Sequence, residues 1–194
     1  MFAATLSGNA QTSLALLGKS GIVKNAYLAG GSALALHLGH RYSIDFDFFT
    51  HQKFSPLKLS EQLEKIGRFK KEVARGISLI GTLNEVKLSY FQYDYPLLFP
   101  TILFLNINIA GIADIAAMKI AAMMDRGTKK DFVDLFEIVK NGFAVEKIFS
   151  FYEKKYGKLG NNIYSIVKSL QYFDDAEKSE MPQMIKKVSW EEVK

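Results

Sequence analysis

The fold is decided by the stretch Leu28-Ala-Gly-Gly-Ser-Ala-Leu-Ala-Leu-His-Leu-Gly-His-Arg-Tyr-Ser-Ile-Asp-Phe-Asp-Phe-Phe49. The apolar run 26–29 predicts a short strand that ends at a glycine pair, and the segment 32–40 predicts a helix with a glycine near its end. The alternation of polar and apolar residues over 43–50 predicts a second strand. A strand, a glycine turn, a helix and another strand therefore follow one another closely.

The second strand carries two carboxylates on one face. Side chains alternate across a strand, so Ser43, Asp45 and Asp47 point to one side and the apolar residues between them to the other. Neighbouring carboxylates repel each other and stay ionised at modest cost only when a cation lies between them. Magnesium prefers carboxylate oxygens and leaves positions open for triphosphate oxygens. The strand thus predicts Asp45 and Asp47 as metal ligands; a half-exposed edge strand with two solvated aspartates is the alternative.

The turn before the helix predicts a phosphate site. Gly30 and Gly31 let the backbone approach a ligand closely, and the start of a helix offers free N–H groups and the positive end of its dipole. Ser32 is also a plain N-cap residue, so a simple turn and cap is the alternative interpretation. The two features together, in this order along the chain, favour a site for a nucleoside triphosphate and its metal.

A second informative segment lies further along the chain. It contains Ile112-Ala-Asp-Ile-Ala-Ala-Met-Lys119, then Asp125-Arg126-Gly127, and then Lys130-Asp131-Phe-Val-Asp134-Leu135. Together with the stretch 28–49, this segment resembles the AbiEii/AbiGii toxin family, which belongs to the DNA polymerase β-like nucleotidyltransferases. The two matching segments span most of the chain in the right order. The resemblance implies a nucleotidyltransferase domain followed by a helical bundle.

The resemblance also implies roles for individual residues. It implies metal binding by Asp45 and Asp47, and catalytic support from Lys119 and from Asp131 or Asp134. The residues that it implies for nucleotide binding are Gly30, Gly31, Ser32, Arg41, Ser43, Lys119 and Arg126. The implied cofactor is Mg²⁺, as one or two ions, and the implied substrate is a nucleoside triphosphate.

The residues of the second segment allow other interpretations. Lys119 lies in an otherwise apolar helix, where a buried lysine is costly unless it is paired, and it shares a helix face with Arg126. Both could instead be long side chains that reach the surface. Asp131 and Asp134 are three residues apart, where acids near a helix start are favoured by the dipole alone. The sequence leaves a phosphate-binding lysine and a structural ion pair as open alternatives.

One position departs from the expected pattern, because polymerase β-like enzymes usually carry a third carboxylate on a later strand. The corresponding strand is Val86-Lys-Leu-Ser-Tyr90, with Ser89 where the acid is expected. Glu85 is predicted to share the face of Ser89 and is one substitute. Otherwise Asp131 or Asp134 must help, or activity is weak. This departure keeps open a protein that binds nucleotide without transferring it.

The remaining pattern predicts an α+β fold with the polymerase β-like nucleotidyltransferase sheet. It predicts helices over 5–19 and 56–66 and strands over 69–74, 77–82, 85–93 and 102–109. Beyond residue 111 it predicts helices over 112–126, 130–141, 145–156 and 161–172, and then a polar tail. We expect a mixed sheet with flanking helices over residues 1–110 and a closely packed helical domain over 111–194 that completes the active site.

The composition fits a cytoplasmic protein with a substantial core. Nearly half of the 194 residues are hydrophobic (48%), and the absence of cysteine excludes disulfides and thiolate metal sites. We expect no signal peptide, because no charged segment followed by a long apolar run opens the chain. The most apolar stretches, 95–109 and 112–124, are interrupted and fall short of the roughly 20 residues of a membrane helix. We therefore expect no membrane segment.

The positive charge is concentrated in one segment. Residues 53–75 contain seven lysines and arginines against three glutamates, whereas the whole chain has a net charge of +5. Because this segment follows the metal-binding strand, we expect it beside the active site, with capacity for a second polyanion through Lys65, Arg68, Lys70, Lys71 and Arg75. RNA, such as tRNA, is the predicted acceptor. A protein acceptor and a merely solvated surface are the alternatives.

Two functions therefore remain open. The first is an enzyme that moves a nucleotide from a triphosphate to RNA or protein, and the resemblance implies a toxin of a toxin–antitoxin or phage-defence pair with an antitoxin as partner. The second is a protein of the same fold that binds nucleotide or a partner with weak or no transfer. The pair Asp45 and Asp47 favours the first, and Ser89 favours the second. His37 and His40 are expected to be surface or structural residues, since magnesium chemistry requires no zinc site.

Overall fold

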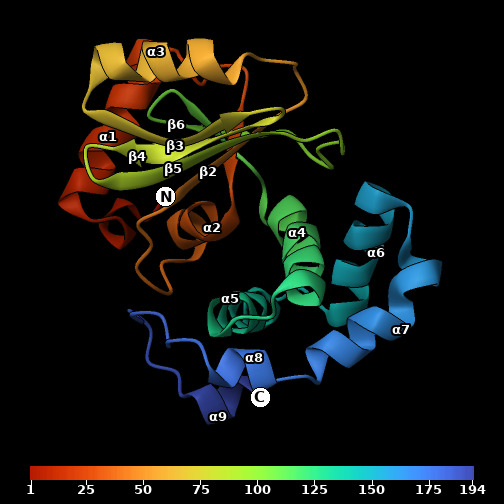
Figure 1. Cartoon of the computed structure of the whole chain (residues 1–194). Helices are drawn as coiled ribbons and strands as arrows, with labels where there is room; N and C mark the ends of the chain where they lie inside the picture. The colour runs from red at the N-terminus through yellow and green to blue at the C-terminus, as the bar shows by residue number, and fades with distance from the viewer.

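The computed structural model describes the backbone of all 194 residues and every side chain except that of Leu159. The strands are β1 (Tyr27–Ala29), β2 (Phe46–Thr50), β3 (Phe69–Arg75), β4 (Ser78–Leu83), β5 (Val86–Gln92), β6 (Ile102–Phe104) and β7 (Ile107–Ile109). The helices are η1 (Ala3–Thr5), α1 (Gly8–Ser20), α2 (Gly30–Leu38), α3 (Pro56–Ile66), α4 (Ile112–Asp125), α5 (Lys129–Lys140), α6 (Val145–Tyr156), α7 (Leu159–Leu170), α8 (Asp174–Glu177) and α9 (Trp190–Val193). Strands mixed with helices are followed by helices alone, which confirms the predicted α+β class (Figure 1).

The seven strands of the described chain form one mixed sheet, in the order β3-β4-β5-β2-β1-β7-β6. β1 pairs antiparallel with β2 and parallel with β7, whereas β2 pairs parallel with β5. β3, β4 and β5 form an antiparallel meander. The central strand β2 therefore lies between β1 and β5, and its side chains can act together with those of both neighbours.

One face of the sheet is covered by α1 and α3 (Figure 1). The strand register aligns Phe48, Tyr90 and Leu79 across this face, and all three side chains are buried. Leu14 of α1 and Leu63 of α3 belong to the same buried cluster. Burial of side chains of this size stabilises the fold by roughly 1.5–3 kcal/mol each. Because side chains alternate, the residues between these positions point to the opposite face.

The opposite face is covered by α2 at β1 and β2. Further along the sheet the cover ends. Lys87 of β5 and Lys70 and Arg75 of β3 are exposed there, and Ile80 of β4 is half-buried. The central strand β2 therefore lies at the step between a covered part and an uncovered part of the same face.

The helical half packs on the sheet through a continuous core. One cluster of buried side chains extends from Leu6 to Ile166 of α7 and includes Ile115 and Ile120 of α4. α4 contacts α2, α5, α6 and α7. The change from strands to helices near residue 110 thus lies within one packed core. Within the described part of the chain, no helix combines the length and the apolar character needed to cross a membrane.

Several element boundaries differ from the predicted ones. The helix predicted from residue 32 begins at Gly30, so the glycine pair forms its first turn. The strand predicted from Ser43 begins three residues later, and Ile44 is exposed instead of joining the apolar face. The strand predicted over 102–109 is a hairpin, because Leu105 and Asn106 adopt the left-handed conformation of a two-residue turn. Neither turn residue is glycine, so composition did not indicate the turn.

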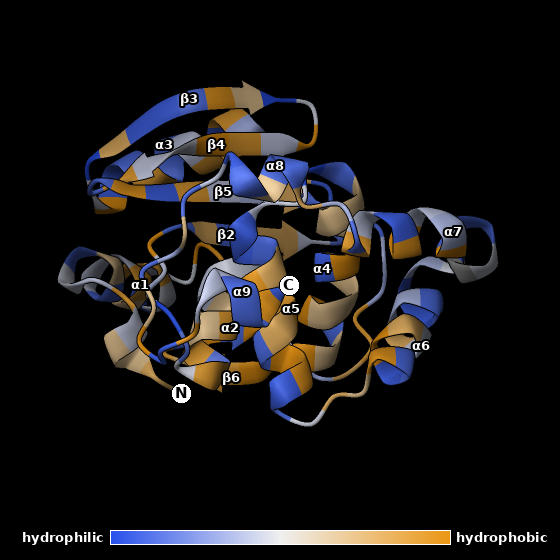
Figure 2. Ribbon diagram, turned by 90° about the horizontal axis from the view of Figure 1, so that it is seen from below, coloured by the Kyte–Doolittle hydropathy of each residue, from blue (hydrophilic) through white to orange (hydrophobic). Residues whose placement is uncertain are grey.

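The polar tail returns to the first half of the chain. The backbone N–H of Tyr42 donates to the carbonyl oxygen of Gln183, and the N–H of Ile185 donates to that of His40. Trp190 of α9 packs edge-on against Phe132 of α5, and Figure 2 shows α9 beside α5. The tail therefore covers the loop between α2 and β2, which its polar composition did not predict.

Candidate active site

The two predicted metal ligands lie at the start of β2, in the centre of the sheet. Asp47 lies opposite Ala29 of β1 and opposite Ser89 of β5. The side chains of Asp45 and Asp47 are half-buried. The side chain of Phe46, between them, is buried in the core on the opposite face of the sheet. The alternation of burial therefore holds over residues 45–47, and the carboxylate of Asp47 lies on the side of α2.

The N-terminus of α2 lies directly beside Asp47. Gly30 has a φ of +67°, and a Cβ atom on this residue would lie only 2.8 Å from Oδ2 of Asp47. Only glycine fits a positive φ and such a close approach. Ala29 precedes the helix and provides no side-chain cap for the N–H groups of the first turn. A helix start of this kind, beside two carboxylates, is suited to hold phosphate groups that share a cation with those carboxylates.

Ser32 is buried, and its hydroxyl holds the loop before β2. Its Oγ donates to the carbonyl oxygen of Asp45 and lies 2.9 Å from Oγ of Ser43. These contacts join the first turn of α2 to the segment that carries the carboxylates. Contacts of Gly31, Ser32 and Ser43 with a nucleotide stay predictions.

The surroundings of Asp47 favour a bound cation. Burial raises the pKa of Asp47, and the charge of Asp45 raises it further. A hydrogen bond from Ser89 and the charges of Lys119 and Arg126 lower the pKa, but they do not cancel the rise. The ionised pair is therefore held at a cost in free energy, and a divalent cation between the carboxylates would remove that cost.

The available ligands fit magnesium. Asp45 and Asp47 supply carboxylate oxygens, and the described side chains contain no group of three or more histidines, cysteines or acids that could enclose an ion. Magnesium usually takes one or two protein carboxylates and completes its octahedron with water and substrate phosphates. The residues present thus suit Mg²⁺ that is bound together with a triphosphate.

Asp134 of α5 is the centre of a buried ion network. Arg41 donates from Nε and Nη2 to its two carboxylate oxygens at 2.7 and 2.8 Å, and Nε2 of His40 lies 2.8 Å from Oδ1. Nζ of Lys119 lies 2.5 Å from Oδ2. Burial alone would raise the pKa of Asp134, but the charges of Lys119 and Arg41 and the hydrogen bonds from Arg41 and His40 hold it well below its usual range.

Asp131 forms the second half of this network. Lys119 donates to Oδ1 of Asp131 at 2.9 Å, and Nε of Arg126 donates to Oδ2 at 3.1 Å. Thr128 donates to Oδ2 at 2.7 Å as part of a capping box at the start of α5. Burial alone would raise the pKa of Asp131, but the charges and hydrogen bonds of Lys119 and Arg126 lower it to about 2. Lys119 and Arg126 thus act from one helix face, as predicted.

We call these contacts the aspartate network and define it as His40, Arg41, Lys119, Arg126, Asp131 and Asp134. It joins the loop after α2 to α4 and α5. A Cβ atom on Gly31 would overlap Nη2 of Arg41, so the second glycine makes room for this guanidinium. The structure pairs Lys119 with both acids of α5. Contacts of Arg41, Lys119 and Arg126 with a nucleotide, and catalytic roles for Asp131 and Asp134, stay predictions.

Sequence reasoning missed the part that His40 has in this network. Of the two expected roles, surface or structural, His40 has the structural one, because its ring is fully buried against a carboxylate. Its neighbour Arg41 is the available signal, because a buried arginine requires an acid as its partner. That acid, Asp134, lies 94 residues away in the sequence, so spacing did not reveal it.

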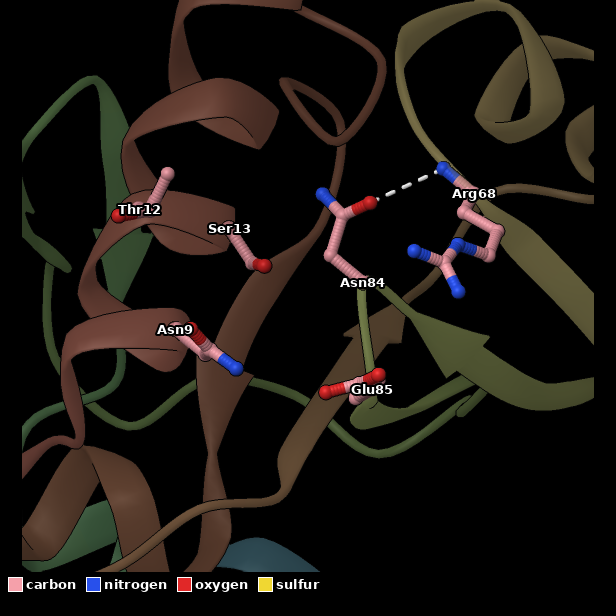
Figure 3. A pocket seen from close by; sticks show the side chains of 6 residues that line it. All are labelled: Asn9, Thr12, Ser13, Arg68, Asn84 and Glu85. Atoms are coloured by element: carbon pink, nitrogen blue, oxygen red, sulfur yellow. Dashed lines mark hydrogen bonds between the residues drawn. The ribbon is translucent and has the colours of Figure 1, made fainter.

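The position expected to hold a third carboxylate is occupied by Ser89, which is hydrogen-bonded to Asp47. Glu85 does not replace it, and the alternative derived from strand alternation is wrong. Glu85 lies in the turn before β5 with a φ of 71° and lines a pocket with Arg68 and Asn84 against α1 (Figure 3). A strand rises by about 3.3 Å per residue, so this turn is about 13 Å from Ser89.

The basic segment lies further from the carboxylates than expected. Its helix, α3, covers the face of the sheet opposite to the carboxylates, and its strand, β3, is the outer edge of the sheet. β4 and β5 separate β3 from β2. Three strand spacings of roughly 4.8 Å put β3 about 14 Å from β2. The expectation that the whole segment lies beside the active site is therefore wrong, because sequence order does not set strand order.

Residues 14–192 match the family described as "Nucleotidyl transferase AbiEii toxin, Type IV TA system". An uncharacterized protein of Aquifex aeolicus (strain VF5) is 42% identical over 178 residues, which cover 89% of this chain and 84% of that protein. The match extends over both the sheet and the helical half.

Solved structures share the fold at low sequence identity. MenT4, a nucleotidyltransferase toxin from Mycobacterium tuberculosis H37Rv, aligns with a TM-score of 0.62 and 14% identity over 96% of this chain and 82% of that chain. The antibiotic-resistance factor ANT(2'')-Ia aligns with a TM-score of 0.55 and 13% identity, over 82% and 96% of the two chains. A putative nucleotidyltransferase from H. pylori gives 0.51 and 18%, over 89% and 87%. These likenesses show the fold of the chain.

Proposed function

The chain belongs to the AbiEii family of nucleotidyltransferase toxins, and on this premise we propose that it transfers a nucleoside monophosphate from a magnesium-bound nucleoside triphosphate to an acceptor. A hydroxyl oxygen of the acceptor would attack the α-phosphorus. The bond between that phosphorus and the oxygen bridging to the β-phosphate would break. Pyrophosphate would leave, and the hydroxyl proton would pass to solvent.

The proposal rests on the surroundings of the carboxylates of Asp45 and Asp47. Among the described side chains, no lysine, arginine or histidine forms an ion pair with Asp45 or Asp47, although partial burial raises the pKa of Asp47. The uncapped start of α2 lies beside them. Bound magnesium would neutralise the pair and stabilise the negative charge on the reacting phosphates.

The chain's own groups would divide the remaining work. The N–H groups of Gly30, Gly31 and Ser32 would bind oxygens of the triphosphate. Lys119 already acts on the pKa of Asp47, so its ammonium is within electrostatic reach of the phosphates. Arg126, whose side chain is 61% exposed, would contact the outer phosphates. The aspartate network would keep these cations oriented before the substrate arrives.

The partners of the reaction follow from charge and from the family. An RNA acceptor such as tRNA would suit the basic strand β3, and a protein acceptor is the alternative. The family is described as a toxin of a toxin–antitoxin system, so a cognate antitoxin is a proposed partner. Nucleoside triphosphates and RNA are substrates of the cytoplasm, where we propose that the protein acts.

A second candidate function rests on Ser89. Its hydroxyl is a hydrogen-bond donor to Asp47, and an un-ionised hydroxyl is a poor base and a weak magnesium ligand compared with a carboxylate. The same fold would then bind nucleotide or a partner with weak or no transfer. Triphosphate binding without incorporation is the result expected of this candidate.

Incorporation of label from each α-labelled nucleoside triphosphate into total cellular RNA tests the proposal. The wild type with Mg²⁺ is expected to label RNA, and the same mixture with EDTA or with Asp45→Ala is expected to leave it unlabelled. Labelling of a protein fraction instead would identify a protein acceptor. Wild-type turnover by Asp45→Ala would refute the assignment of the metal ligands, and magnesium-dependent binding without any labelled product would favour the second candidate.

Lys119→Ala tests the role of the lysine between the two sites. We expect triphosphate affinity to fall more than the free energy of unfolding, because Arg41 and Arg126 still neutralise Asp134 and Asp131. Isothermal titration with Mg²⁺ and triphosphate measures the first quantity, and urea denaturation measures the second. Equal losses in both would make Lys119 a structural ion-pair partner only.

A further inference from the structure

The face of the sheet that carries Asp45 and Asp47 continues across β5, β4 and β3 without the cover that α2 provides at β2. We call this surface the open face. Its residues are Lys87, Ser89 and Phe91 of β5, Ser78, Ile80 and Thr82 of β4, and Lys70, Val73 and Arg75 of β3. The assignment follows from the register, because residues opposite each other in paired strands share a face.

One row of the open face is basic. Phe46, the first residue of β2, pairs with Leu88, so Lys87, which precedes Leu88 in β5, lies near the segment that carries Asp45. Thr82 lies opposite Lys87, and Lys70 lies opposite Thr82. Both lysines are exposed. Their ammonium groups therefore line a path that begins at the carboxylates and reaches the outer edge of the sheet, about 14 Å away.

A second row combines aromatic rings with a cation. Phe49 of β2 lies opposite Phe91, Phe91 opposite Ser78, and Ser78 opposite Arg75. The ring centroids of Phe49 and Phe91 are 5.7 Å apart, and both side chains are half-buried, whereas Arg75 is exposed. This row is four residues away from the basic row along both β5 and β4, and the row of Ser89 and Ile80 lies between them. A ring is thus accessible near the carboxylates and a guanidinium at the edge.

The charge of the open face is one-sided. Among the described residues of β3, β4 and β5, those on this face include Lys70, Arg75 and Lys87 and no acid. The acid of β3, Glu72, is the extra residue of a bulge between positions 71 and 73 and pairs with no residue of β4. The surface beyond the two aspartates is therefore positively charged and attracts a polyanion.

We propose that the open face binds a single-stranded nucleic acid and presents its end to Asp45 and Asp47 as the acceptor. Cations that follow a strand of phosphates, interleaved with rings on which bases stack, are the composition that binds single strands. Bases in a duplex are already stacked on each other, so exposed rings favour unpaired nucleotides. The role as acceptor rests on the proposed function, whereas the binding does not require transfer.

The binding is tested by fluorescence anisotropy with a labelled single-stranded RNA of about 12 nucleotides over a salt series. The test variant is Lys70→Ala/Arg75→Ala/Lys87→Ala. The matched control is Lys58→Ala/Lys65→Ala/Lys71→Ala, which removes the same charge from α3 and from the covered face, where residue 71 lies opposite buried Gly81.

When log K for a single strand is plotted against the logarithm of the salt concentration, each phosphate contact contributes about −0.7 to the slope. The test variant is therefore expected to lower the steepness of that slope by about 2 and the control to leave it unchanged. Equal effects of the two variants would overturn the proposal, since net charge rather than the open face would then control binding. Equal wild-type affinity for a polyglutamate peptide of the same net charge would also overturn it.

Phe91 tests the stacking part of the proposal. A stacked base contributes about 1–3 kcal/mol by alanine substitution, so Phe91→Ala is expected to weaken RNA binding by roughly 5-fold to 150-fold without changing the salt slope. Phe91→Tyr keeps the ring and should bind like the wild type. Thermal melting confirms that each variant is folded. Wild-type affinity in a folded Phe91→Ala variant would overturn stacking on this ring.

Magnesium-dependent triphosphate binding separates this proposal from the proposed function. The triple test variant is expected to bind triphosphate like the wild type and to lose RNA binding and RNA labelling together. If the wild type binds RNA through the open face but transfers nothing, the proposed function fails and this inference stands. If the test variant binds and labels RNA like the wild type, this inference fails and the proposed function stands.

Discussion

Two pairs of aspartates in this molecule have opposite surroundings. Asp47 on β2 and Asp45, just before this strand, are half-buried, and among the described side chains they have no ion-pair partner. Asp131 and Asp134 on α5 are fully buried and ion-paired with lysine and arginine. Burial raises the pKa in both places, yet the net result is a raised pKa for Asp47 and a pKa of about 2 for Asp131.

The comparison shows that neighbouring charges, not burial, decide what a carboxylate can do. The α5 pair already has its cations, and these ion pairs hold α4, α5 and the loop after α2 together. The net effect of the groups around Asp47 is still a raised pKa, and a helix start lies nearby, so this pair gains most from a cation brought in with the substrate. The pair on α5 is therefore suited to stabilise the fold, and the pair at β2 is suited to bind a cation.

Exchange of Asp47 for asparagine is the sharpest test of this comparison. Asp47→Asn removes a metal ligand and is expected to slow nucleotide transfer by about 10³-fold or more, since charge stabilisation by a metal ion is worth several kcal/mol. The free energy of unfolding should stay the same or rise, because the repulsion with Asp45 disappears. Initial rates of labelled transfer and urea denaturation measure the two effects. A variant that loses stability as well as activity would break the comparison.

Asp134→Ala should have the opposite effect on stability and lower the free energy of unfolding. It leaves Arg41, His40 and Lys119 buried without their shared acid, so a loss of about 3–5 kcal/mol in the free energy of unfolding is expected. Asp125→Ala at the exposed end of α4 is the matched control and should change stability by less than about 0.5 kcal/mol. Urea denaturation at neutral pH measures both. Similar small losses would mean that the network contributes little to the fold.

Acid unfolding probes the α5 pair through Asp131. Its pKa of about 2 in the folded protein is below the usual value near 3.9 of an unfolded chain. Its ionisation therefore contributes about 2 kcal/mol of stability above pH 4, and this contribution is lost as the pH falls from 4 to 2. Asp131→Asn should be less stable at pH 6 and should lose less stability on acidification. Parallel stability–pH curves for wild type and variant would contradict this.

Magnesium should act on the β2 pair and not on the α5 pair. At a concentration ten times its dissociation constant, Mg²⁺ is expected to stabilise the wild type by about 1.4 kcal/mol, as measured by the shift in thermal melting. Asp45→Asn/Asp47→Asn should show no shift, whereas Asp131→Asn should show the wild-type shift. A magnesium-dependent shift in the double variant would put the metal elsewhere.

Local rules predicted the faces of the central strand well and its ends less well. Alternation placed Asp47 on the face opposite the buried Phe46 and Phe48 as expected, because the side-chain period of a strand is independent of what surrounds it. It failed at Ile44 and at Glu85, which lie just outside their strands, since hydrogen-bond pairing and turn geometry determine where a strand begins. The aspartates could therefore be found from the sequence, and the substitute for a third acid could not.

The sequence by itself determined the elements that depend on near neighbours: the glycine pair before a helix, the two carboxylates on one strand face, and the helices of the second half. Only the tertiary structure decided which groups meet over long separations. Arg41 and His40 reach Asp134 across more than 90 residues, and the buried acid could have paired with other cations. Strand order moved β3 to the edge, away from β2. Contacts of this kind follow from the packing of whole elements, and the local sequence pattern does not indicate them.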